Sequence, residues 1–286
     1  MPLEAKRSSK TLAVIAGQGS LPAAIASEAK EAGYYVIGIA LQPVADESLR
    51  PLTDEFHKVN IGRLGSLISL LGKLSVKDAV MAGKVSKELL YKNKTSMIPD
   101  MKAIKLIMSL KDRKDDTIMN AFVGELEKAG VILHKTTSFT KGLLAPEGPI
   151  TNTWVSDSQM QDINFGWDIA REMGRLDIGQ TVVVKNQAVM AIEAIEGTDE
   201  CIVRGGKLAV SDAVVIKVSK PQQDMRFDVP VVGADTLQSM KSVSASLLAI
   251  EAGKCIIIDK NNFIKEAEKF GITVFGVSTT RPANKD

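Results

Sequence analysis

The sequence predicts an α/β protein with two domains: an N-terminal, Rossmann-like domain built on an open parallel sheet, and a C-terminal α+β domain. Residues 11–16 and 34–41 are apolar runs joined by a glycine turn and a helical pattern, which is typical of a βαβ unit. Residues 142–149 contain two glycines and two prolines, the composition of a linker. The second half mixes helical patterns with short strands. We therefore place the domains at residues 1–146 and 147–286.

Two strand ends in the first half carry candidate ligand-binding residues. The first apolar strand runs into a turn with Gly17, Gly19 and Ser20, and a strand over residues 78–82 runs into Gly83 and Lys84. In open α/β sheets, ligands bind beyond the carboxyl ends of the strands. Backbone N–H groups at a helix N-terminus also favour an anion. We predict that these five residues contact a phosphate or nucleotide; a tight turn without a ligand is the competing interpretation.

The same turn resembles a dinucleotide-binding fingerprint only in part. Pro22 stands where the third glycine of that fingerprint would be, and the second strand ends in Ala40-Leu41-Gln42-Pro43 without an acidic residue for a ribose. Both departures disfavour NAD. A nucleotide-dependent oxidoreductase stays as the alternative function.

The second half has polar residues concentrated at its strand ends. Its pattern predicts helices near 162–176, 201–205, 235–241 and 262–270, strands near 181–184, 189–194, 213–218 and 272–277, and a short hairpin after residues 249–254. The strand-end side chains include Asp177, Gln180, Glu193, Thr198 and Asp199. Hard oxygen ligands on loops suit Mg²⁺, which also bridges to substrate phosphates.

The loop over residues 220–233 is the first place to look for chemistry. Two prolines bracket its polar side chains, so its backbone is restricted. Asp224 and Asp228 suit a divalent cation, while Lys220 and Arg226, with the amide of Gln223, are suited to phosphate. A solvated surface loop is the competing interpretation.

Composition removes several classes of function. The 286 residues carry a net charge of +2 and only 5% aromatics, which argues against a nucleic-acid partner. Cys201 and Cys255 form no CxxC motif, and His57 and His134 are too few for a three-histidine zinc site. No apolar run approaches the length that spans a bilayer. We expect a cytoplasmic protein with at most peripheral membrane contact.

Several segments in chain order resemble one known family, the LpxI-type UDP-2,3-diacylglucosamine pyrophosphatases of lipid A biosynthesis. No single segment is decisive, but together they span nearly the whole chain. The matching stretches are residues 15–22, Ala82-Gly83-Lys84-Val85, Asp115-Asp116, 143–148, 175–180, 193–199, 220–230 and Glu251-Ala252-Gly253-Lys254.

The resemblance implies hydrolysis of the substrate's pyrophosphate to UMP and 2,3-diacylglucosamine 1-phosphate (lipid X), with Mg²⁺-dependent attack of water on the α-phosphorus. It also implies a lipid-linked nucleotide-sugar substrate bound between two domains, action at the inner membrane surface, and leaves a homodimer open. We assign catalysis to Asp228, then Asp224, and metal binding to Asp228, Glu193 and Asp199. Candidate substrate contacts are Gly17, Gly19, Ser20, Gly83, Lys84, Asp177, Gln180, Thr198, Lys220, Gln223 and Arg226. A non-enzymatic nucleotide-sugar or lipid carrier is a further alternative; it would gain little from so many carboxylates.

Overall fold

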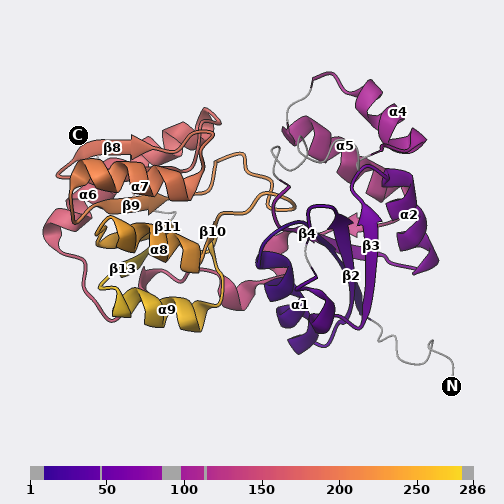
Figure 1. Ribbon diagram of the computed structural model, residues 1–286, viewed down its shortest axis with the longest axis horizontal. Helices are drawn as coiled ribbons and strands as arrows, with labels where there is room; N and C mark the ends of the chain where they lie inside the picture. The colour runs from indigo at the N-terminus through magenta and orange to yellow at the C-terminus, as the bar shows by residue number, and fades with distance from the viewer. Residues whose placement is uncertain (1–9, 46, 86–97, 113–114, 279–286) are drawn as a thin grey trace. The chain divides into compact units, whose positions relative to one another are not determined.

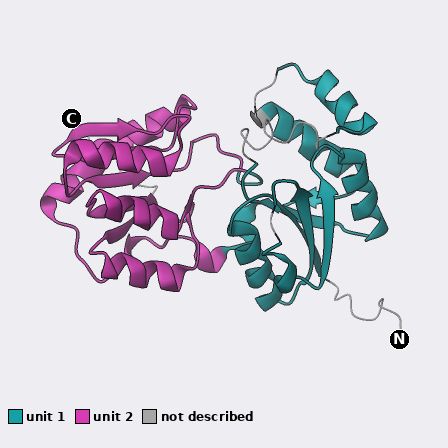
Figure 2. Cartoon of the chain, in the orientation of Figure 1, with its two compact units in different colours: residues 1–140, 225–227 teal, residues 141–224, 228–286 magenta. Residues whose placement is uncertain are grey.

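The computed structural model describes residues 10–45, 47–85, 98–112 and 115–278, and the chain divides into two compact units (Figure 2). Unit 1 comprises Met1–Thr140 and Met225–Phe227, and unit 2 comprises Lys141–Asp224 and Asp228–Asp286. The division therefore lies at residues 140 and 141, whereas the sequence pattern placed it after residue 146. Three residues of the 220–233 loop belong to unit 1, so the chain passes between the units three times.

Unit 1 is built on a five-stranded sheet in the order β3-β2-β1-β4-β5, and every neighbouring pair in it is parallel (Figure 1). This confirms the predicted open parallel sheet. The elements are β1 (Thr11–Ala16), α1 (Leu21–Glu31), β2 (Tyr35–Gln42), η2 (Arg50–Leu52), β3 (Glu55–Asn60), α2 (Leu64–Lys73), β4 (Asp78–Ala82), α4 (Met101–Ser109), α5 (Asp115–Lys128), β5 (Ile132–Leu133) and η4 (Thr136–Phe139).

Helices cover both faces of this sheet, which is why its central strands are continuous apolar runs. On one face, Leu12 and Val14 of β1 pack with Ile25 of α1. On the other face, residues such as Ile15 pack with Leu67 of α2 and with residues of α5. The alternation of side chains along β1 thus feeds two separate cores, and the free carboxyl edge of the sheet is left for loops.

Unit 2 contains a six-stranded mixed sheet in the order β6-β13-β11-β9-β7-β8. Strands β13, β11 and β9 are parallel to one another, while β6, β7 and β8 pair antiparallel with their neighbours. The predicted α+β domain is confirmed. The elements are η5 (Lys141–Leu143), β6 (Gly148–Pro149), α6 (Asp157–Arg175), β7 (Thr181–Lys185), β8 (Ala188–Ile192), α7 (Thr198–Ala209), β9 (Val214–Lys217), β10 (Val231–Val232), α8 (Ala234–Ser242), β11 (Leu247–Glu251), β12 (Ile256–Ile257), α9 (Lys260–Lys269) and β13 (Thr273–Val277).

One prediction for unit 2 is wrong. Residues 249–254 do not lead into a hairpin, because β11 is a buried strand paired in parallel with both β9 and β13. After the turn at Gly253, β12 pairs instead in parallel with β10 as a separate two-stranded sheet. Parallel partners need long crossover connections, so the strand that follows in sequence is not the partner in space.

Helix α6 covers one face of the unit 2 sheet, and α7, α8 and α9 cover the other. Trp167 of α6 packs with Val182 and Ile216, whose neighbours in sequence, Val183 and Val215, pack with Ile202 of α7. No helix in the described ranges is both long enough and apolar enough to cross a membrane.

Candidate functional site

In unit 1, the loops after β1 and β4 are joined by their backbones. Gly17 N–H donates to Ala82 O at 2.8 Å, and Gln18 and Lys84 exchange two hydrogen bonds of 2.9 and 2.8 Å. Because β1 and β4 are adjacent parallel strands, both loops leave the same edge of the sheet. The structure therefore brings three predicted residues together at this edge: Gly17, Gly83 and Lys84.

The close approach of the two loops requires glycine at both Gly17 and Gly83. A Cβ added at Gly17 would lie 2.7 Å from Lys84 O, and one added at Gly83 would lie 2.7 Å from the carbonyl carbon of Gly17. Gly83 also has a φ of +90°, in the region that favours glycine. Gly17 and Gly83 thus position Lys84. Gly19 and Ser20 lie in the turn before α1, whose second residue, Pro22, has no N–H to offer a ligand.

In unit 2, four predicted residues form one chain of hydrogen bonds. Lys220 Nζ lies 2.6 Å from Asp177 Oδ1, and Lys220 N–H donates to Gln223 Oε1 at 2.8 Å. The amide of Gln223 donates in turn to Gln180 Oε1 at 3.5 Å. Asp177 follows α6 with a left-handed φ of +57°, which turns the chain toward β7. The network places a lysine ammonium beside two side-chain amides, a set of groups that can bind phosphate oxygens.

Glu193 and Thr198 continue this network below the surface. Glu193 is buried and accepts hydrogen bonds from Thr198 Oγ1 at 3.1 Å and from Gln180 N–H at 3.4 Å. Thr198 Oγ1 accepts in turn from Lys217 Nζ at 2.8 Å. Only 4% of Lys217 is exposed, and it is the last residue of β9. Sequence reasoning missed Lys217, because it lies inside the apolar run 213–218; a single lysine in such a run was the available signal.

A second buried carboxylate lies at the same edge of the sheet. Glu251 is the last residue of β11. The residue before it, Ile250, is the register partner of Lys217 in β9. The Glu251 carboxylate accepts hydrogen bonds of 2.6 Å from both N–H and Oγ of Ser219, and forms an ion pair of 3.0 Å with Lys254. Lys217 and Glu251, at the carboxyl ends of parallel strands in unit 2, thus both have hydrogen-bond partners. Ligands commonly bind beyond this end of the strands in such sheets.

Asp224 and Asp228 are joined by their backbones, since Asp228 N–H donates to Asp224 O at 3.0 Å. The three residues between them belong to unit 1. There Met225 O accepts from Thr136 N–H at 2.8 Å, and Phe227 packs against the core of α2 and α5. The predicted phosphate ligand Arg226 donates to Asn120 Oδ1 at 3.2 Å and lies 3.7 Å from Glu127 Oε1, both on α5.

Both halves of the chain match domain models of one protein family. The LpxI N-terminal domain model matches residues 11–143, and the LpxI C-terminal domain model matches residues 146–275. The chain belongs to the LpxI family. The UDP-2,3-diacylglucosamine pyrophosphatase LpxI of Caulobacter vibrioides is 31% identical over 281 residues, which cover 94% of this chain and 98% of that protein. The predictions of an enzyme, and of a pyrophosphatase, are confirmed by this relationship.

Two solved structures show a remote likeness to this LpxI-family chain. Glycinamide-RNase-transformylase T from Mycobacterium tuberculosis is 14% identical, with a TM-score of 0.23 over 64% of this chain and 44% of that one. The biotin carboxylase subunit of pyruvate carboxylase is also 14% identical, with a TM-score of 0.26 over 64% of this chain and 35% of that one. Scores this low do not establish a shared fold or activity.

The described part of the LpxI-family chain contains no group of three or more His, Cys, Asp and Glu side chains placed to hold a metal ion. The predicted ligands Asp228, Glu193 and Asp199 therefore do not form a three-ligand site. Glu193 already accepts two hydrogen bonds within its network.

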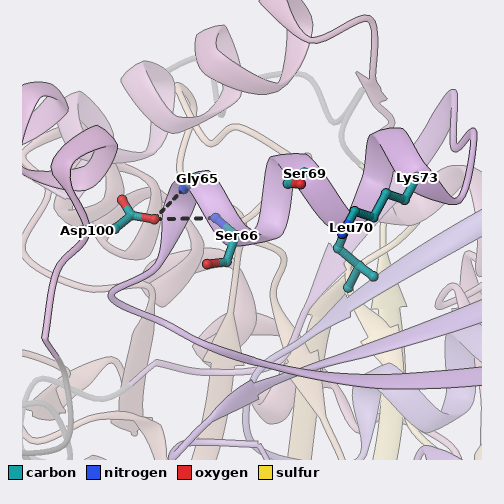
Figure 3. A pocket seen from close by; sticks show the side chains of 6 residues that line it. All are labelled: Gly65, Ser66, Ser69, Leu70, Lys73 and Asp100. Atoms are coloured by element: carbon teal, nitrogen blue, oxygen red, sulfur yellow. Dashed lines mark hydrogen bonds between the residues drawn. The ribbon is translucent and has the colours of Figure 1, made fainter.

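A hollow of about 430 Å³ lies beside α2, and none of the predicted site residues lines it (Figure 3). Its lining comprises Gly65, Ser66, Ser69, Leu70, Lys73 and Asp100. Asp100 accepts hydrogen bonds from Gly65 N–H at 2.7 Å and Ser66 N–H at 3.3 Å, and also caps α4 by accepting from Ala103 N–H. Burial raises the pKa of Asp100, but its backbone hydrogen bonds together hold that pKa below the ordinary value. The Asp100 carboxylate thus occupies the place at the N-terminus of α2 where a bound anion would accept the same backbone hydrogen bonds.

Proposed function

We propose that this chain hydrolyses UDP-2,3-diacylglucosamine to UMP and 2,3-diacylglucosamine 1-phosphate. The observation that carries the proposal is its 31% identity, over 94% of the chain, to a relative named for pyrophosphatase action on that compound. Both halves match the corresponding family models, so the likeness is not confined to one domain.

Two lysines are our candidates for binding the pyrophosphate. Lys220 lies on the exposed side of the unit 2 network, where Asp177 and Gln223 orient it. Lys84 lies at the carboxyl edge of the unit 1 sheet, where Gly17 and Gly83 permit its backbone pairing. Both sites supply positive charge at a sheet edge, which suits the negative charge of a substrate pyrophosphate.

The proposed chemistry is a single displacement at phosphorus. The water oxygen forms a bond to the α-phosphorus, and the bridging P–O bond breaks, so its electron pair leaves with the sugar 1-phosphate. We assign to the Asp228 carboxylate the orientation of this water and the acceptance of its proton. Asp228 is suited to the role because its backbone is tied to Asp224, which holds the two carboxylates on one short loop.

Magnesium is the cofactor that we propose. Asp228 and Asp224 are the carboxylates that would hold it, because the described residues offer no larger cluster and Glu193 is engaged elsewhere. Mg²⁺ is commonly bound through one or two carboxylates and substrate phosphates. When bound, it would neutralise charge on the phosphate oxygens.

The test uses the purified chain with diacylated UDP-sugar and mass-spectrometric detection of products. We expect UMP and the sugar phosphate to form, EDTA to stop the reaction, and Asp228→Asn to lower the rate at least a hundredfold. Asp235→Asn, at an exposed position in the first turn of α8, is the matched control and should keep its rate. In water enriched in oxygen-18, the label should enter UMP.

Each part of the proposal has its own contrary result. Normal turnover by Asp228→Asn would remove the site assignment. Label found only in the sugar phosphate would rule out attack at the α-phosphorus. Substrate binding without turnover at saturating Mg²⁺ would favour a carrier, and tight NADH binding would favour an oxidoreductase.

The proposed substrate also suggests where the protein works. This substrate carries two acyl chains, so the substrate molecule resides in a bilayer. We propose that the protein acts from the cytoplasmic side at the surface of the inner membrane.

A further inference from the structure

Helix α4 and the residues just before it present large apolar side chains to solvent. The exposed fractions are 66% for Ile98, 67% for Met101, 51% for Ile107 and 80% for Met108. These four large apolar residues lie within one stretch of eleven residues. We call them the α4 apolar surface. Figure 1 shows α4 at the periphery of unit 1, beside α2 and α5.

The two methionines of the α4 apolar surface do not lie on the face with which α4 packs on its unit. Ala103 is the buried residue of the helix, and α4 is joined to α2 through the cap that Asp100 provides. Met101 and Met108 are seven residues apart, so they lie on one face, and the position of Ala103 is rotated about 140–160° from them, whereas Ile107 lies only about 40° from Ala103. A surface helix ordinarily has polar residues on its outer face. Here two exposed methionines lie on the outer face beside Lys105, a mixture of apolar and basic side chains that suits a membrane interface better than water alone.

The charged side chains of α4 itself are lysines. Residues 101–112 include Lys102, Lys105 and Lys111 and one acidic residue, the exposed Asp112 beyond the end of the helix. Lys102 pairs with Glu125 of α5 at 3.3 Å, while Lys105 and Lys111 lie exposed. The carboxylate of Asp100, just before the helix, is occupied by backbone N–H groups of both helices. An apolar strip flanked by lysines is complementary to an anionic bilayer surface.

We propose that the α4 apolar surface docks the protein on a bilayer that contains anionic phospholipid. The proposal rests on the proposed function, since a diacylated substrate must be reached in a membrane. The methionines enter the interface while Lys105 and Lys111 meet the headgroups. Methionine suits this role because its flexible side chain adapts to irregular apolar surroundings.

Two other occupants fit the observations less well. An acyl chain of the substrate would be held in a groove, but none of the four residues lines the hollow found on α2 in the described ranges. A second copy of the same face would bring like charges together at Lys105 and Lys111.

The experiment measures vesicle binding by the full chain. Vesicles of phosphatidylcholine alone are compared with vesicles that also contain phosphatidylglycerol, at low and high salt. We expect binding to require phosphatidylglycerol and to weaken with salt. The double variant Met101→Gln, Met108→Gln should bind roughly tenfold more weakly or worse, because two apolar side chains no longer enter the interface. Leu208→Gln, at an exposed position of α7, is the matched control and should bind as the unaltered chain does.

A rate assay separates this surface from the catalytic machinery. With substrate dispersed in detergent, the double variant should match the unaltered chain; with substrate in anionic vesicles, it should be slower. If the rate of the double variant falls equally in detergent, the methionines bind the acyl chains of the substrate and the proposal is overturned. A dimer that the double variant converts to a monomer would assign the surface to a second copy, with the same consequence. Failure of the unaltered chain to bind anionic vesicles would also overturn it. If no UMP forms with any variant, the proposed function fails while the vesicle result still decides the docking surface.

Discussion

Adding one methyl group at Gly17 separates a structural role for this residue from a role in ligand binding. The new Cβ of Gly17→Ala would lie 2.7 Å from Lys84 O and 3.1 Å from the carbonyl carbon of Gly83. Ordinary contacts begin near 3.4 Å, and the neighbours are backbone atoms rather than flexible side-chain ends. The loops after β1 and β4 must therefore move apart.

The magnitude follows from the bonds that this movement strains. Three backbone hydrogen bonds of 2.8 to 2.9 Å join the loops through Gly17, Gln18 and Lys84. Each contributes about 1 kcal/mol to stability, so losing all three would cost about 3 kcal/mol. Alanine lowers the entropy of the unfolded chain relative to glycine and recovers about 0.5 kcal/mol. We expect a net loss of about 2.5 kcal/mol for unit 1.

The assay must report on unit 1 alone, because a two-unit chain need not unfold in one step. Both tryptophans, Trp154 and Trp167, lie in unit 2, so their fluorescence serves as the internal reference. Hydrogen exchange by mass spectrometry of peptides over residues 11–20 and 78–85 reports the loops directly. We expect faster exchange there and an unchanged fluorescence transition.

A second glycine provides the control. A Cβ at Gly72, within α2, would meet no atom within 4 Å, and its φ is not in the left-handed region. Gly72→Ala should therefore stabilise unit 1 by about 0.5–1 kcal/mol. If Gly17→Ala leaves exchange unchanged and affects only the KM of UMP release, the glycine serves the ligand and the steric argument is refuted.

Three further predictions concern groups with defined surroundings. The pKa of Asp100 is lower in the folded chain than its ordinary value of 3.8. Its contribution to stability is therefore complete above pH 3.8 and is lost as the pH falls through the lower, folded-state pKa. In urea melts, the difference in unfolding free energy between the unaltered chain and Asp100→Asn should narrow as the pH falls below 3.8, and a constant difference would contradict this. Burial raises the pKa of Cys201 and Cys255 to about 12, so iodoacetamide at pH 8 should label neither thiol before unfolding, and labelling of the folded chain in intact-mass spectra would refute it. Lys220→Met should raise the KM for UMP release about tenfold while changing stability by less than about 1 kcal/mol, because its pair with Asp177 is partly exposed; an unchanged KM would remove Lys220 from the site.

Sequence patterns were sufficient for elements whose burial is uniform. Residues 11–16 and 78–82 were predicted as strands and are β1 and β4, because strands covered on both faces are short, continuous apolar runs. The parallel sheet followed from the βαβ pattern. For the site, the patterns singled out Asp177, Gln180 and Lys220, since polar groups just beyond strands gather at sheet edges, and these three share one hydrogen-bond network.

What the patterns missed depends on contacts between distant parts of the chain. Residues 249–254 suggested a local turn into a hairpin, but β11 takes its partners from 33 residues before and 26 residues after it. Lys217 looked like part of an apolar strand, because its partner Thr198 begins α7 and does not lie in the neighbouring sequence. The glycines at 17 and 83 suggested a ligand, and only the pairing of two distant loops shows the steric need.

Residues 224–228 combine architecture with the proposed chemistry, and two variants can separate these roles. The bond from Asp228 N–H to Asp224 O is a backbone bond, so Asp228→Asn leaves it in place. We therefore expect this variant to lose activity without a shift in either unfolding transition. Phe227→Ala keeps both carboxylates but removes a half-buried ring from the core of unit 1, at a cost of about 2 kcal/mol. Comparable losses of stability in the two variants would mean that Asp228 holds the loop rather than the water, and its catalytic assignment would fall.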